Sequence, residues 1–471
     1  MVNLHEDIYV DLDGTLVQTD LLFESAIQLL KNNFFYIALF PFWLLKGRSH
    51  LKSKIAERTS INIDSLPYNH NLIEYLREKK NDGHHLFLAT ASHQKFADQV
   101  SEHLGIFQGV IATNDRCNLK SHQKLVAIRK NSDRFSYIGN SRDDYCLFEH
   151  AQNAILVNGS KRFTKKTNEI FKIDRVFPVT PWSFKTLLSS LRIYQWTKNV
   201  LLFIPLFLSG SLSEEQSLST IVMMFFSFSL LASATYIFND LSDIENDRQH
   251  PRKCSRPIAS GVLPIPVAIL SAFILIIASY SIAFLIGPKA TMGLSCYLVI
   301  TLFYTYIAKT YFLVDVIFLA TLYSIRIIIG AVVINLDVSI WLLAFSMFIF
   351  LSLALVKRVS ELLTLQQKSR TTTSGRDYTI SDVNILTMMG IVSAFISVLV
   401  IMLFIAEGTE YKNPEFIWFI CPIVLYWTSR LWFKTIRHEM TDDPIVFAFK
   451  DKGSLVCGIF IFITISLSIY L

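Results

Sequence analysis

Four oxygen-bearing side chains follow directly on an apolar run that is long enough to cross a membrane. The run covers residues 217–238, and the stretch NDLSDIENDRQHPRKCSRPIASG follows at residues 239–261. If the helix continues, a turn of about 100° per residue places four side chains on one face: Asn239, Asp240, Asp243 and Asp247. Charges beside a bilayer are costly, and neighbouring carboxylates repel each other unless a cation lies among them. Oxygen-only ligands suit Mg²⁺, which typically bridges carboxylates to substrate phosphates. The spacing therefore predicts a magnesium site at this helix end, with Glu245 pointing away.

Basic side chains come next in the same stretch. Arg248, Arg252, Lys253 and Arg256 could hold further phosphate oxygens through charge-assisted hydrogen bonds. The alternative is a solvated helix end whose charges only mark the membrane interface. The asparagine, the basic residues and the RPIASG turn together favour a binding site.

This stretch, written NDxxDxxxDRxxPxKxxRPIASG, resembles the first aspartate-rich motif of the UbiA-type intramembrane prenyltransferase superfamily. The resemblance implies an all-α bundle of nine transmembrane helices. Most aromatic prenyltransferases of that superfamily carry a second aspartate-rich motif, which this chain lacks. In its place stands YTYIAKTYFLVD, which contains Tyr304, Lys309 and Asp315.

Four further segments narrow the resemblance to one branch: QWTKNVLLF, LYSIRIIIGA, LSLALVKRVSELL and DDPIVFAFKD, the last with Asp442 and Asp443. Together they are similar to the decaprenyl-phosphate phosphoribosyltransferase-like enzymes, over about residues 186–455. The branch implies transfer of 5-phosphoribose from phosphoribosyl diphosphate (PRPP) to a polyprenyl phosphate of the decaprenyl or undecaprenyl type, with release of pyrophosphate.

PRPP carries a diphosphate and a distant 5-phosphate, so its site needs a metal pole and a separate basic pole. The catalytic carboxylates Asp240, Asp243 and Asp247 would supply the first through Mg²⁺. The candidates for binding phosphates and substrate are Lys198, Asn199, Asn239, Arg252, Arg256, Tyr304, Lys309, Arg326, Lys357 and Arg358. For Lys357 and Arg358 the alternative is anchoring at the cytoplasmic interface, and for Arg326 it is a structural ion pair, for example with Asp315. The acceptor phosphate is already anionic, so orientation and electrostatics suffice for catalysis.

The amino-terminal part carries a second set of carboxylates. IYVDLDGTL, residues 8–16, is a strand that runs into Asp11 and Asp13. A carboxylate at a strand end can attack a phosphoryl group, and one two residues later can act as general acid/base. The segment resembles motif I of the haloacid dehalogenase (HAD) phosphatases. The resemblance implies that Asp11 is the nucleophile and Asp13 the acid/base, with Mg²⁺ between the nucleophile and the phosphate.

Three later segments follow the HAD order. HLFLATASH ends a strand at Thr90, a phosphate-binding hydroxyl, and CNLKSHQK offers Lys120 as the phosphate lysine, with Lys124 as the alternative. FSYIGNSRDD then departs from the pattern, because Asn140 replaces a metal-binding carboxylate ahead of Asp144. The implied metal ligands are Asp11, Asp13, Asn140 and Asp144. Because Asn140 lacks the charge of that carboxylate, two interpretations of the domain remain. It is either an active phosphatase or a weakened remnant that only recognises substrate.

The composition divides the chain in two. Residues 1–180 mix charged and apolar residues and predict an α/β, Rossmannoid HAD-like domain with a small helical cap at about 20–80. Residues 181–471 predict the membrane domain. The nine expected spans are 187–208, 218–238, 263–286, 290–308, 311–334, 339–362, 384–406, 415–433 and 454–471.

The start of the sequence and the distribution of basic residues among the loops predict how the chain is oriented in the membrane. The start of the sequence does not resemble a signal peptide. Among the loops between the expected spans, those at 240–262, 363–383 and 434–453 hold most of the basic residues, including Lys368, Arg370 and Arg376, whereas the opposite loops hold only Lys289 and Lys412. We therefore expect a multi-pass protein of the bacterial inner (cytoplasmic) membrane with its amino-terminal domain in the cytoplasm. The net charge of +6 fits basic loops and no nucleic-acid partner, and the six scattered cysteines predict neither disulfides nor zinc. The sequence leaves a homo-oligomer open.

Residues 32–48, NNFFYIALFPFWLLKGR, stand where a HAD cap is expected. The apolar core is too short to span a bilayer and contains Pro41. Two interpretations remain, namely burial within the cap or a segment that dips into the membrane, rimmed by Lys46 and Arg48.

Two rival functions frame these expectations. An aromatic prenyltransferase with a regulatory or weakly active HAD-like domain is disfavoured by the missing second aspartate-rich motif. A lipid or ion transporter is compatible with nine spans, but it would give the metal-ligand face no purpose.

Overall fold

A computed structural model of the chain describes residues 6–115, 117–158, 160–211, 214–366, 377–407, 411–440 and 443–470. It divides into two compact units, of which the first is Met1–Ser190 with Ile237–Ser271 and the second is Leu191–Tyr236 with Ala272–Leu471. The boundary expected at residue 180 lies ten residues before the end of the first segment. The aspartate-rich stretch at 239–261 belongs to the first unit, together with the amino-terminal residues.

Within the described residues, six parallel strands of the first unit form one sheet. Their order is β3 (Gly109–Thr113), β2 (His85–His93), β1 (Asp7–Val10), β4 (Phe135–Gly139), β5 (Ala154–Val157) and β6 (Ile173–Phe177). All residues of β4 and β5 are buried, as expected for a parallel sheet that helices cover on both faces. The order reverses between β1 and β4, and ligands of such sheets typically bind at the carboxyl ends of the strands beside this reversal.

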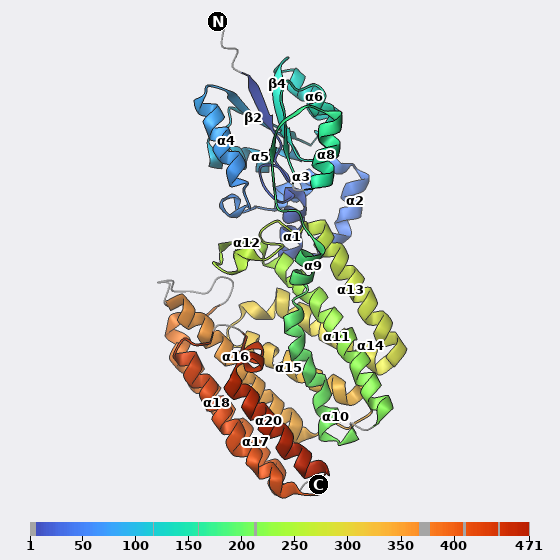
Figure 1. The fold of residues 1–471 in the computed structure, drawn as a ribbon, viewed down its shortest axis with the longest axis vertical. Coiled ribbons are helices and arrows are strands. Elements are labelled where there is room, and N and C mark those ends of the chain that lie inside the picture. Colours follow the sequence, from blue (N-terminus) through green and yellow to red (C-terminus); the bar gives the residue numbers. More distant parts are fainter. Residues whose placement is uncertain are drawn as a thin grey trace. The chain divides into compact units, whose positions relative to one another are not determined.

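Two hydrophobic cores lie on the two faces of the sheet. Val10 joins the core that includes Leu72 of α4 (His70–Asn81) and Phe96 of α5 (Gln94–Leu104). Its neighbour Tyr9 joins the other core, with Leu125 of α6 (His122–Arg129). Successive strand residues point to opposite faces, so both must be apolar here. The remaining helices of the amino-terminal segment are α7 (Tyr145–Phe148), α8 (Lys161–Ile170) and α9 (Phe184–Ser190) (Figure 1).

A helical insertion separates β1 from β2 at the position expected for a cap. It contains α1 (Leu21–Asn32), η1 (Phe34–Leu39), α2 (Phe40–Leu45), α3 (Arg48–Arg58) and η2 (Ile63–Ser65). The side chain of Asp20 caps α1 by accepting a hydrogen bond from the backbone N–H of Leu22 at 2.9 Å. Neither η1 nor α2 contains a buried residue. The interpretation that residues 32–48 are buried within a cap is therefore wrong.

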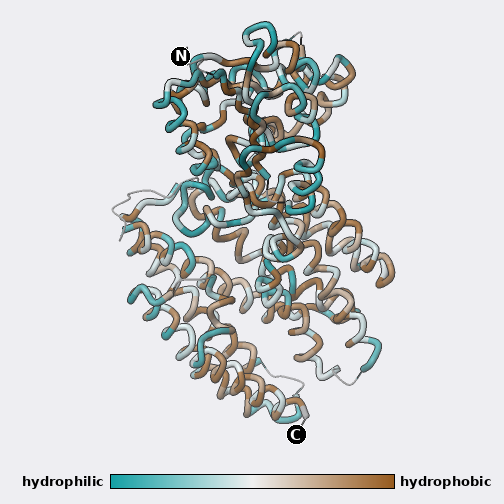
Figure 2. Tube along the Cα trace, turned by 45° about the horizontal axis from the view of Figure 1, so that its top comes forward, coloured by the Kyte–Doolittle hydropathy of each residue, from teal (hydrophilic) through white to brown (hydrophobic). Residues whose placement is uncertain are grey.

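Seven helices among the described residues are long and apolar enough to cross a membrane. They are α11 (Glu215–Ser242), α13 (Ile265–Ile286), α15 (Val314–Val333), α16 (Ile340–Gln366), α17 (Val383–Glu407) with the preceding η8 (Ile380–Asp382), α18 (Ile420–Ile436) with the preceding η9 (Pro414–Phe419), and α20 (Lys452–Tyr470). The tubes of the second unit are accordingly hydrophobic over most of their length (Figure 2). Helices α17, α18 and α20 run side by side (Figure 1). These helices account for seven of the nine expected spans.

The other two expected spans differ from the prediction in form. The fourth coincides with α14 (Pro288–Tyr306), a helix of 19 residues that falls outside the seven. The first is divided among α9, η4 (Ile193–Phe203) and α10 (Ile204–Leu208), with a left-handed backbone at Arg192 (φ 52°). Polar side chains in η4 contact neighbouring elements, so this stretch does not behave as a uniform apolar helix. The count of nine spans stays a prediction.

Candidate functional site

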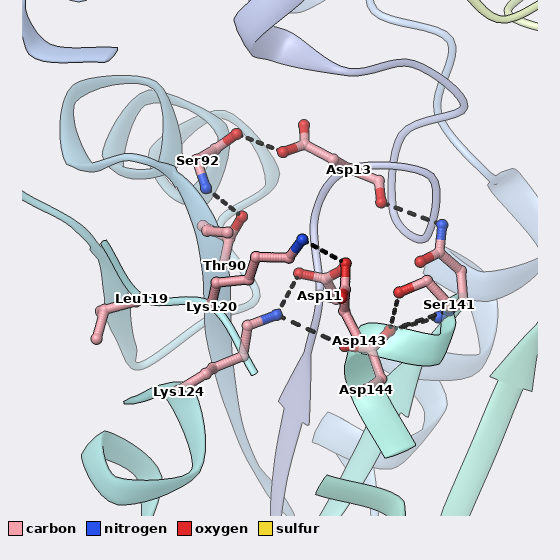
Figure 3. A network of polar contacts seen from close by, with 12 residues as sticks. Asp11, Asp13, Thr90, Ser92, Leu119, Lys120, Lys124, Ser141, Asp143 and Asp144 are labelled. Carbon is pink, nitrogen blue, oxygen red and sulfur yellow. Dashed lines mark hydrogen bonds and ion pairs between the residues drawn. The ribbon is translucent and has the colours of Figure 1, made fainter. Parts of the chain in front are cut away.

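The carboxyl ends of β1 and β4 bring the amino-terminal carboxylates together. Asp11 follows β1, and its backbone N–H donates to the carbonyl of Ile138 at 2.9 Å. The buried Lys124 of α6 places its Nζ 2.8 Å from Asp11 Oδ1 and 3.8 Å from Asp144 Oδ1 (Figure 3). The same Nζ donates to the hydroxyl of Tyr137 at 2.9 Å. This end of the sheet is therefore a buried cluster of two carboxylates and one ammonium group.

The lysine at the site is Lys124, and the prediction that favoured Lys120 over it is corrected. The Lys120 side chain is 44% exposed and forms an ion pair with Asp143 at 2.8 Å. Lys124 lies one turn into α6, on the face that packs against the sheet, and is 3% exposed. Sequence spacing alone could not distinguish Lys124 from Lys120, because which of the two lysines faces the site depends on the residue at which α6 begins.

Asp13 is held by the start of the helical insertion and by β2. Its Oδ1 accepts a hydrogen bond from the backbone N–H of Leu21 at 3.0 Å, and its other oxygen accepts one from the hydroxyl of Ser92. The Thr90 hydroxyl accepts a bond from the backbone N–H of Ser92 at 2.9 Å. Ser92 was missed in the sequence, although it stands two residues after Thr90 and so on the same side of the strand.

Asp144 organises the loop that carries Asn140. Its Oδ2 accepts hydrogen bonds from the backbone N–H groups of Asn140 at 3.1 Å and Ser141 at 3.0 Å, and from the Ser141 hydroxyl. The Asn140 amide donates to the backbone carbonyl of Asp13 at 3.2 Å. A Cβ on Gly14, which has φ +73°, would lie 2.0 Å from this amide nitrogen. Glycine is therefore required where the Asp13 turn meets Asn140.

Burial sets the electrostatics of this site. It raises the pKa of Asp11 to about 6, with Asp144 adding to the rise and Lys124 opposing it. Burial also raises the pKa of Asp13 to about 7, with the nearby charge of Asp20 contributing. Burial alone would lower the pKa of Lys124, but Asp11 and Asp144 raise it above the ordinary value. Asp13 can thus carry a proton near neutral pH, as a general acid must.

The aspartate-rich stretch does not form the continuous helix that the sequence predicted. Helix α11 ends at Ser242, Asp243 leaves the helical conformation (φ −104°, ψ 12°), and α12 covers Ile244–Gln249. The backbone N–H of Asp243 still donates to Asn239, and that of Asp247 donates to Asp243 at 2.8 Å. The break at Asp243 is therefore local, because backbone hydrogen bonds between residues four apart continue on both sides of it.

Two of the four predicted side chains converge on one arginine. Arg256 Nη1 lies 3.1 Å from Asp240 Oδ1 and 2.5 Å from Asp247 Oδ2, and both carboxylates are buried. Burial raises the pKa of Asp247, as does the charge of Asp240, while Arg256 lowers it. The positive charge of Arg256 thus partly neutralises two carboxylates that both contact its Nη1 atom.

Other residues of the stretch attach it to the amino-terminal part of the first unit. Arg248 forms an ion pair with Glu24 of α1 and donates to the carbonyl of Ala259 at 2.8 Å. Gly261 has φ +76°, and a Cβ there would lie 2.2 Å from the carbonyl oxygen of Gln18. The expectation that Arg248 serves phosphate is therefore corrected, because its guanidinium is buried against Glu24. The Glu245 carboxylate accepts a hydrogen bond from the backbone N–H of Asn62 at 3.3 Å.

A second polar cluster lies within the second unit. Lys198 of η4 and Lys357 of α16 place their Nζ atoms 2.7 Å and 3.2 Å from Asp443 Oδ2. The Tyr323 hydroxyl lies 3.3 Å from the same oxygen, and the carboxylate caps α19 (Pro444–Lys450). Burial would raise the pKa of Asp443, but the two lysines hold it well below its usual range. Two predicted cationic side chains therefore meet at one anionic oxygen.

Arg326 lies beside this cluster, because its guanidinium is 5.8 Å from the ring centre of Tyr323 and its partner Asn199 is the neighbour of Lys198. Its Nε donates to Asn199 Oδ1 at 2.9 Å, and its guanidinium lies 5.0 Å from the ring centre of Phe228 and 5.3 Å from that of Tyr297. The Asn199 amide donates to Ser229 at 2.9 Å. The alternative that Arg326 pairs with Asp315 is wrong.

Arg358 is the residue that pairs with Asp315. Its Nε lies 2.5 Å from Asp315 Oδ2, and the same guanidinium contacts Glu361. The Tyr378 hydroxyl donates to the other Asp315 oxygen. Arg358 and Asp315 are almost fully buried, so we correct the prediction that Arg358 binds phosphate. The geometry gives it a structural role between α15 and α16.

The remaining predicted residues are placed more simply. Tyr304 and Lys309 are half-buried, in α14 and η7 (Ala308–Thr310) respectively. Asn239 is half-buried near the end of α11, and Arg252 is exposed. Asp442 and the loop residues Lys368, Arg370 and Arg376 lie outside the described residues.

The side chains that could coordinate Mg²⁺ occur in small groups. Across the part of the chain that the structure describes, no three His, Cys, Asp or Glu side chains form a group that could hold a metal ion. Mg²⁺ usually needs only one or two protein carboxylates, because substrate phosphates and water complete its coordination. Two pairs of carboxylates could supply these one or two protein ligands: Asp240 with Asp247, and Asp11 with Asp144.

Comparisons with known proteins agree with the motifs of the membrane part. Residues 201–450 match the UbiA prenyltransferase family. An uncharacterized protein y4nM of Sinorhizobium fredii is 35% identical over 460 residues, which cover 95% of this chain and 88% of that protein. Decaprenyl-phosphate phosphoribosyltransferase of Mycobacterium tuberculosis is 37% identical over 177 residues, 37% of this chain and 59% of that enzyme.

A solved structure of a UbiA homolog from Archaeoglobus fulgidus, bound to GPP and Mg²⁺, aligns with 60% of this chain and 99% of its own, at 17% identity and a TM-score of 0.48. The family match extends over more than half of the sequence and includes most of the long apolar helices. The chain is a multi-pass membrane protein that belongs to the UbiA prenyltransferase family.

Proposed function

We propose that the membrane part transfers 5-phosphoribose from PRPP to a polyprenyl phosphate of the decaprenyl or undecaprenyl type and releases pyrophosphate. The observation that carries this proposal is the 37% identity over 177 residues to a decaprenyl-phosphate phosphoribosyltransferase. The chain spans 59% of that enzyme's length, so the activity is inferred for this chain and not transferred outright.

The chemistry of the aspartate-rich stretch supports the proposal. Asp240 and Asp247 would hold Mg²⁺ together with the diphosphate of PRPP, and Asp243 lies at the break between them. Bound Mg²⁺ would neutralise the charge that develops on the leaving pyrophosphate. Arg256 contacts both carboxylates and can turn to the diphosphate oxygens, because its side chain is 26% exposed.

The cationic residues of the second unit supply binding for a further phosphate. Lys198 and Lys357 both approach Asp443 Oδ2, so two ammonium groups already converge on the position of one anionic oxygen. Asn199 and the aromatic rings hold Arg326 in a fixed orientation. Charged side chains in a membrane domain rarely face lipid, and here Lys198 and Arg326 are buried while Lys357 is partly buried.

The transfer step needs no protein nucleophile. An oxygen of the lipid phosphate forms a bond to C1 of the ribose, while the bond from C1 to the diphosphate oxygen breaks. The electron pair of that bond leaves with pyrophosphate, and no proton is exchanged. The protein contributes orientation and fixed charges.

We propose that the amino-terminal domain is a HAD-like phosphatase that removes the 5-phosphate from the ribosylated lipid. An Asp11 oxygen would attack phosphorus, and the bond from phosphorus to ribose O5 would break as Asp13 donates a proton to that oxygen. Water then hydrolyses the aspartyl phosphate, with Asp13 accepting its proton. Mg²⁺ between Asp11, Asp144 and the Asn140 amide would offset the charge on phosphate. The raised pKa of Asp13 suits the donating role.

The transfer is tested by pyrophosphate release from the purified full-length chain in lipid nanodiscs. Release should require PRPP, Mg²⁺ and decaprenyl phosphate together. Release from prenyl diphosphate and an aromatic acid, with none from PRPP, would assign the chain to aromatic prenylation instead.

The phosphatase is tested separately with Asp11→Asn. Loss of the nucleophile should abolish release of inorganic phosphate from the ribosylated lipid and leave pyrophosphate release unchanged. If the unmodified protein releases no inorganic phosphate and Asp11→Asn changes nothing, the amino-terminal domain is a recognition or regulatory module.

We also propose that the chain lies in the bacterial inner membrane with its amino-terminal domain in the cytoplasm. The basic residues on alternate loops support this orientation. In a chain whose Cys117, Cys146, Cys254 and Cys296 are replaced by serine, labelling of Lys130→Cys by an impermeant maleimide should occur only in inverted membrane vesicles, and labelling in intact spheroplasts would contradict it.

A further inference from the structure

The helical insertion of the first unit carries an apolar surface that the chain leaves uncovered. It is formed by residues 34–45, which make up η1 and α2. Seven large hydrophobic side chains of this segment are exposed: Phe34, Phe35, Ile37, Leu39, Phe42, Leu44 and Leu45. Phe35 and Leu45 are 84% and 85% exposed, far more than packing within a domain would leave. Contiguous apolar surface of this kind marks a binding surface.

The segment has a defined shape of its own. The ring centre of Trp43 lies 6.0 Å from that of Tyr36 and 5.9 Å from that of Phe40, so the three aromatic residues pack together. The guanidinium of Arg58 in α3 lies 5.4 Å from the Trp43 ring centre. Outside this aromatic group, the side chains of Phe34, Phe35 and Phe42 and of the large aliphatic residues remain exposed.

The charges around the segment specify what it binds. Residues 25–56 contain five basic residues and neither Asp nor Glu: Lys31, Lys46, Arg48, Lys52 and Lys54. Lys31, Lys46 and Arg48 are exposed and flank the apolar residues on both sides along the chain. An apolar surface with a basic border is complementary to an anionic lipid surface, because such a surface attracts basic residues that lie close to it.

Length decides how the segment meets the bilayer. Twelve helical residues extend about 18 Å, whereas the hydrocarbon core is about 30 Å thick. The segment is therefore too short to cross and can only lie in the interface. A bilayer is always available to it, because the chain is a multi-pass membrane protein.

We propose that residues 34–45 insert into the headgroup boundary of an anionic bilayer and attach the amino-terminal domain to the membrane surface. Phe35, Phe42 and Leu45 enter the acyl boundary, and Lys46 and Arg48 bind lipid phosphates. This attachment does not depend on which reaction the chain catalyses. It is also distinct from the anchoring of the chain by its transmembrane helices.

The proposal is tested by spin labels in the full-length chain, with Cys117, Cys146, Cys254 and Cys296 replaced by serine. Phe35→Cys and Leu45→Cys carry the label in the segment, and Lys130→Cys carries it at the exposed position that directly follows α6. In nanodiscs of phosphatidylglycerol, labels at 35 and 45 should be relaxed by oxygen and protected from a water-soluble nickel chelate. The label at 130 should show the opposite preference.

Two results would overturn the proposal. Nickel accessibility at 35 and 45 equal to that at 130 would show that the segment lies in water. Dipolar broadening at 35 that disappears on dilution with unlabelled chains would show that a second copy covers the surface.

Charge-reversed chains test the basic border separately. Lys46→Glu with Arg48→Glu should shift the labels at 35 and 45 toward nickel accessibility, and should remove the difference between phosphatidylglycerol and phosphatidylcholine nanodiscs. Lys79→Glu with Lys80→Glu, on α4, serves as the matched control and should leave that difference unchanged. Equal effects of the two pairs would contradict recognition of anionic lipid by this border.

Discussion

Lys124 is the side chain that neutralises the proposed nucleophile of the amino-terminal domain. It contacts Asp11 at 2.8 Å and approaches Asp144, while Lys120 forms an ion pair with the exposed Asp143. We predict that Lys124→Met abolishes phosphate release and lowers the free energy of unfolding by about 3–5 kcal/mol, because it leaves a buried carboxylate uncompensated. Lys120→Met should reduce phosphate release and the free energy of unfolding by much less. Phosphate release and thermal unfolding of the two variants check this, and equal effects would contradict the assignment.

Asn140 offers a second test at the scale of single residues. Its amide donates to the Asp13 carbonyl, and Asn140→Asp would replace that donor by a charged oxygen. Without divalent cation we expect a loss of about 1–3 kcal/mol in stability, since two acceptors would face each other. With Mg²⁺ the variant should bind the ion more tightly than the unmodified protein does. Thermal unfolding across a Mg²⁺ titration measures both, and a titration identical to that of the unmodified protein would contradict a metal site at Asn140.

At the scale of elements, the break between α11 and α12 defines the aspartate-rich site. Asp240 and Asp247 lie on opposite sides of the break and share Arg256. We predict that Asp247→Ala lowers pyrophosphate release more than tenfold, equivalent to about 1.4 kcal/mol of barrier. Glu245→Gln is the matched control, because Glu245 contacts a backbone amide of the amino-terminal part and should leave the rate unchanged. A smaller loss at Asp247 would show that it is not a principal ligand.

The pairing of α15 with α16 gives a stability prediction that is independent of chemistry. Arg358 and Asp315 form a buried ion pair between these helices, whereas the neighbouring Lys357 faces Asp443. Arg358→Met should therefore destabilise the protein by about 3–5 kcal/mol, and the double variant with Asp315→Leu should recover much of this loss. Lys357→Met should affect transfer more than stability. Thermal unfolding in detergent would contradict this if Arg358→Met and Lys357→Met behaved alike.

The strands and most spans could be predicted because each depends on local sequence. Apolar runs such as those of α13 and α17 are long enough to be recognised alone. The break at Asp243 could not be predicted, since Asn239 to Asp247 fits a continuous helix equally well. The division of the first expected span into η4 and α10 depends on tertiary hydrogen bonds from Asn199 and its neighbours. Similarly, only the fold shows that Arg358, and not Arg326, is the partner of Asp315.

At the scale of the whole molecule, the first unit joins segments that the sequence separates. Arg248 and Glu24 stand 224 residues apart and form a buried ion pair, and Gly261 packs against the Gln18 backbone. No spacing rule connects such positions, so the sequence predicted the aspartate-rich stretch as part of the membrane domain alone. Helix α1, which begins beside Asp13, is thereby linked to the stretch that holds Asp240 and Asp247.

We propose above all that this UbiA-family chain attaches phosphoribose to a polyprenyl phosphate. Mass spectrometry of the lipid after incubation with PRPP, Mg²⁺ and decaprenyl phosphate tests it most directly. Asp11→Asn should give decaprenyl phosphate enlarged by one phosphoribosyl group, the unmodified protein should give the ribosyl product, and Asp247→Ala should leave the lipid unchanged. A lipid of unchanged mass with all three chains, while prenyl diphosphate and an aromatic acid yield a prenylated acid, would contradict it.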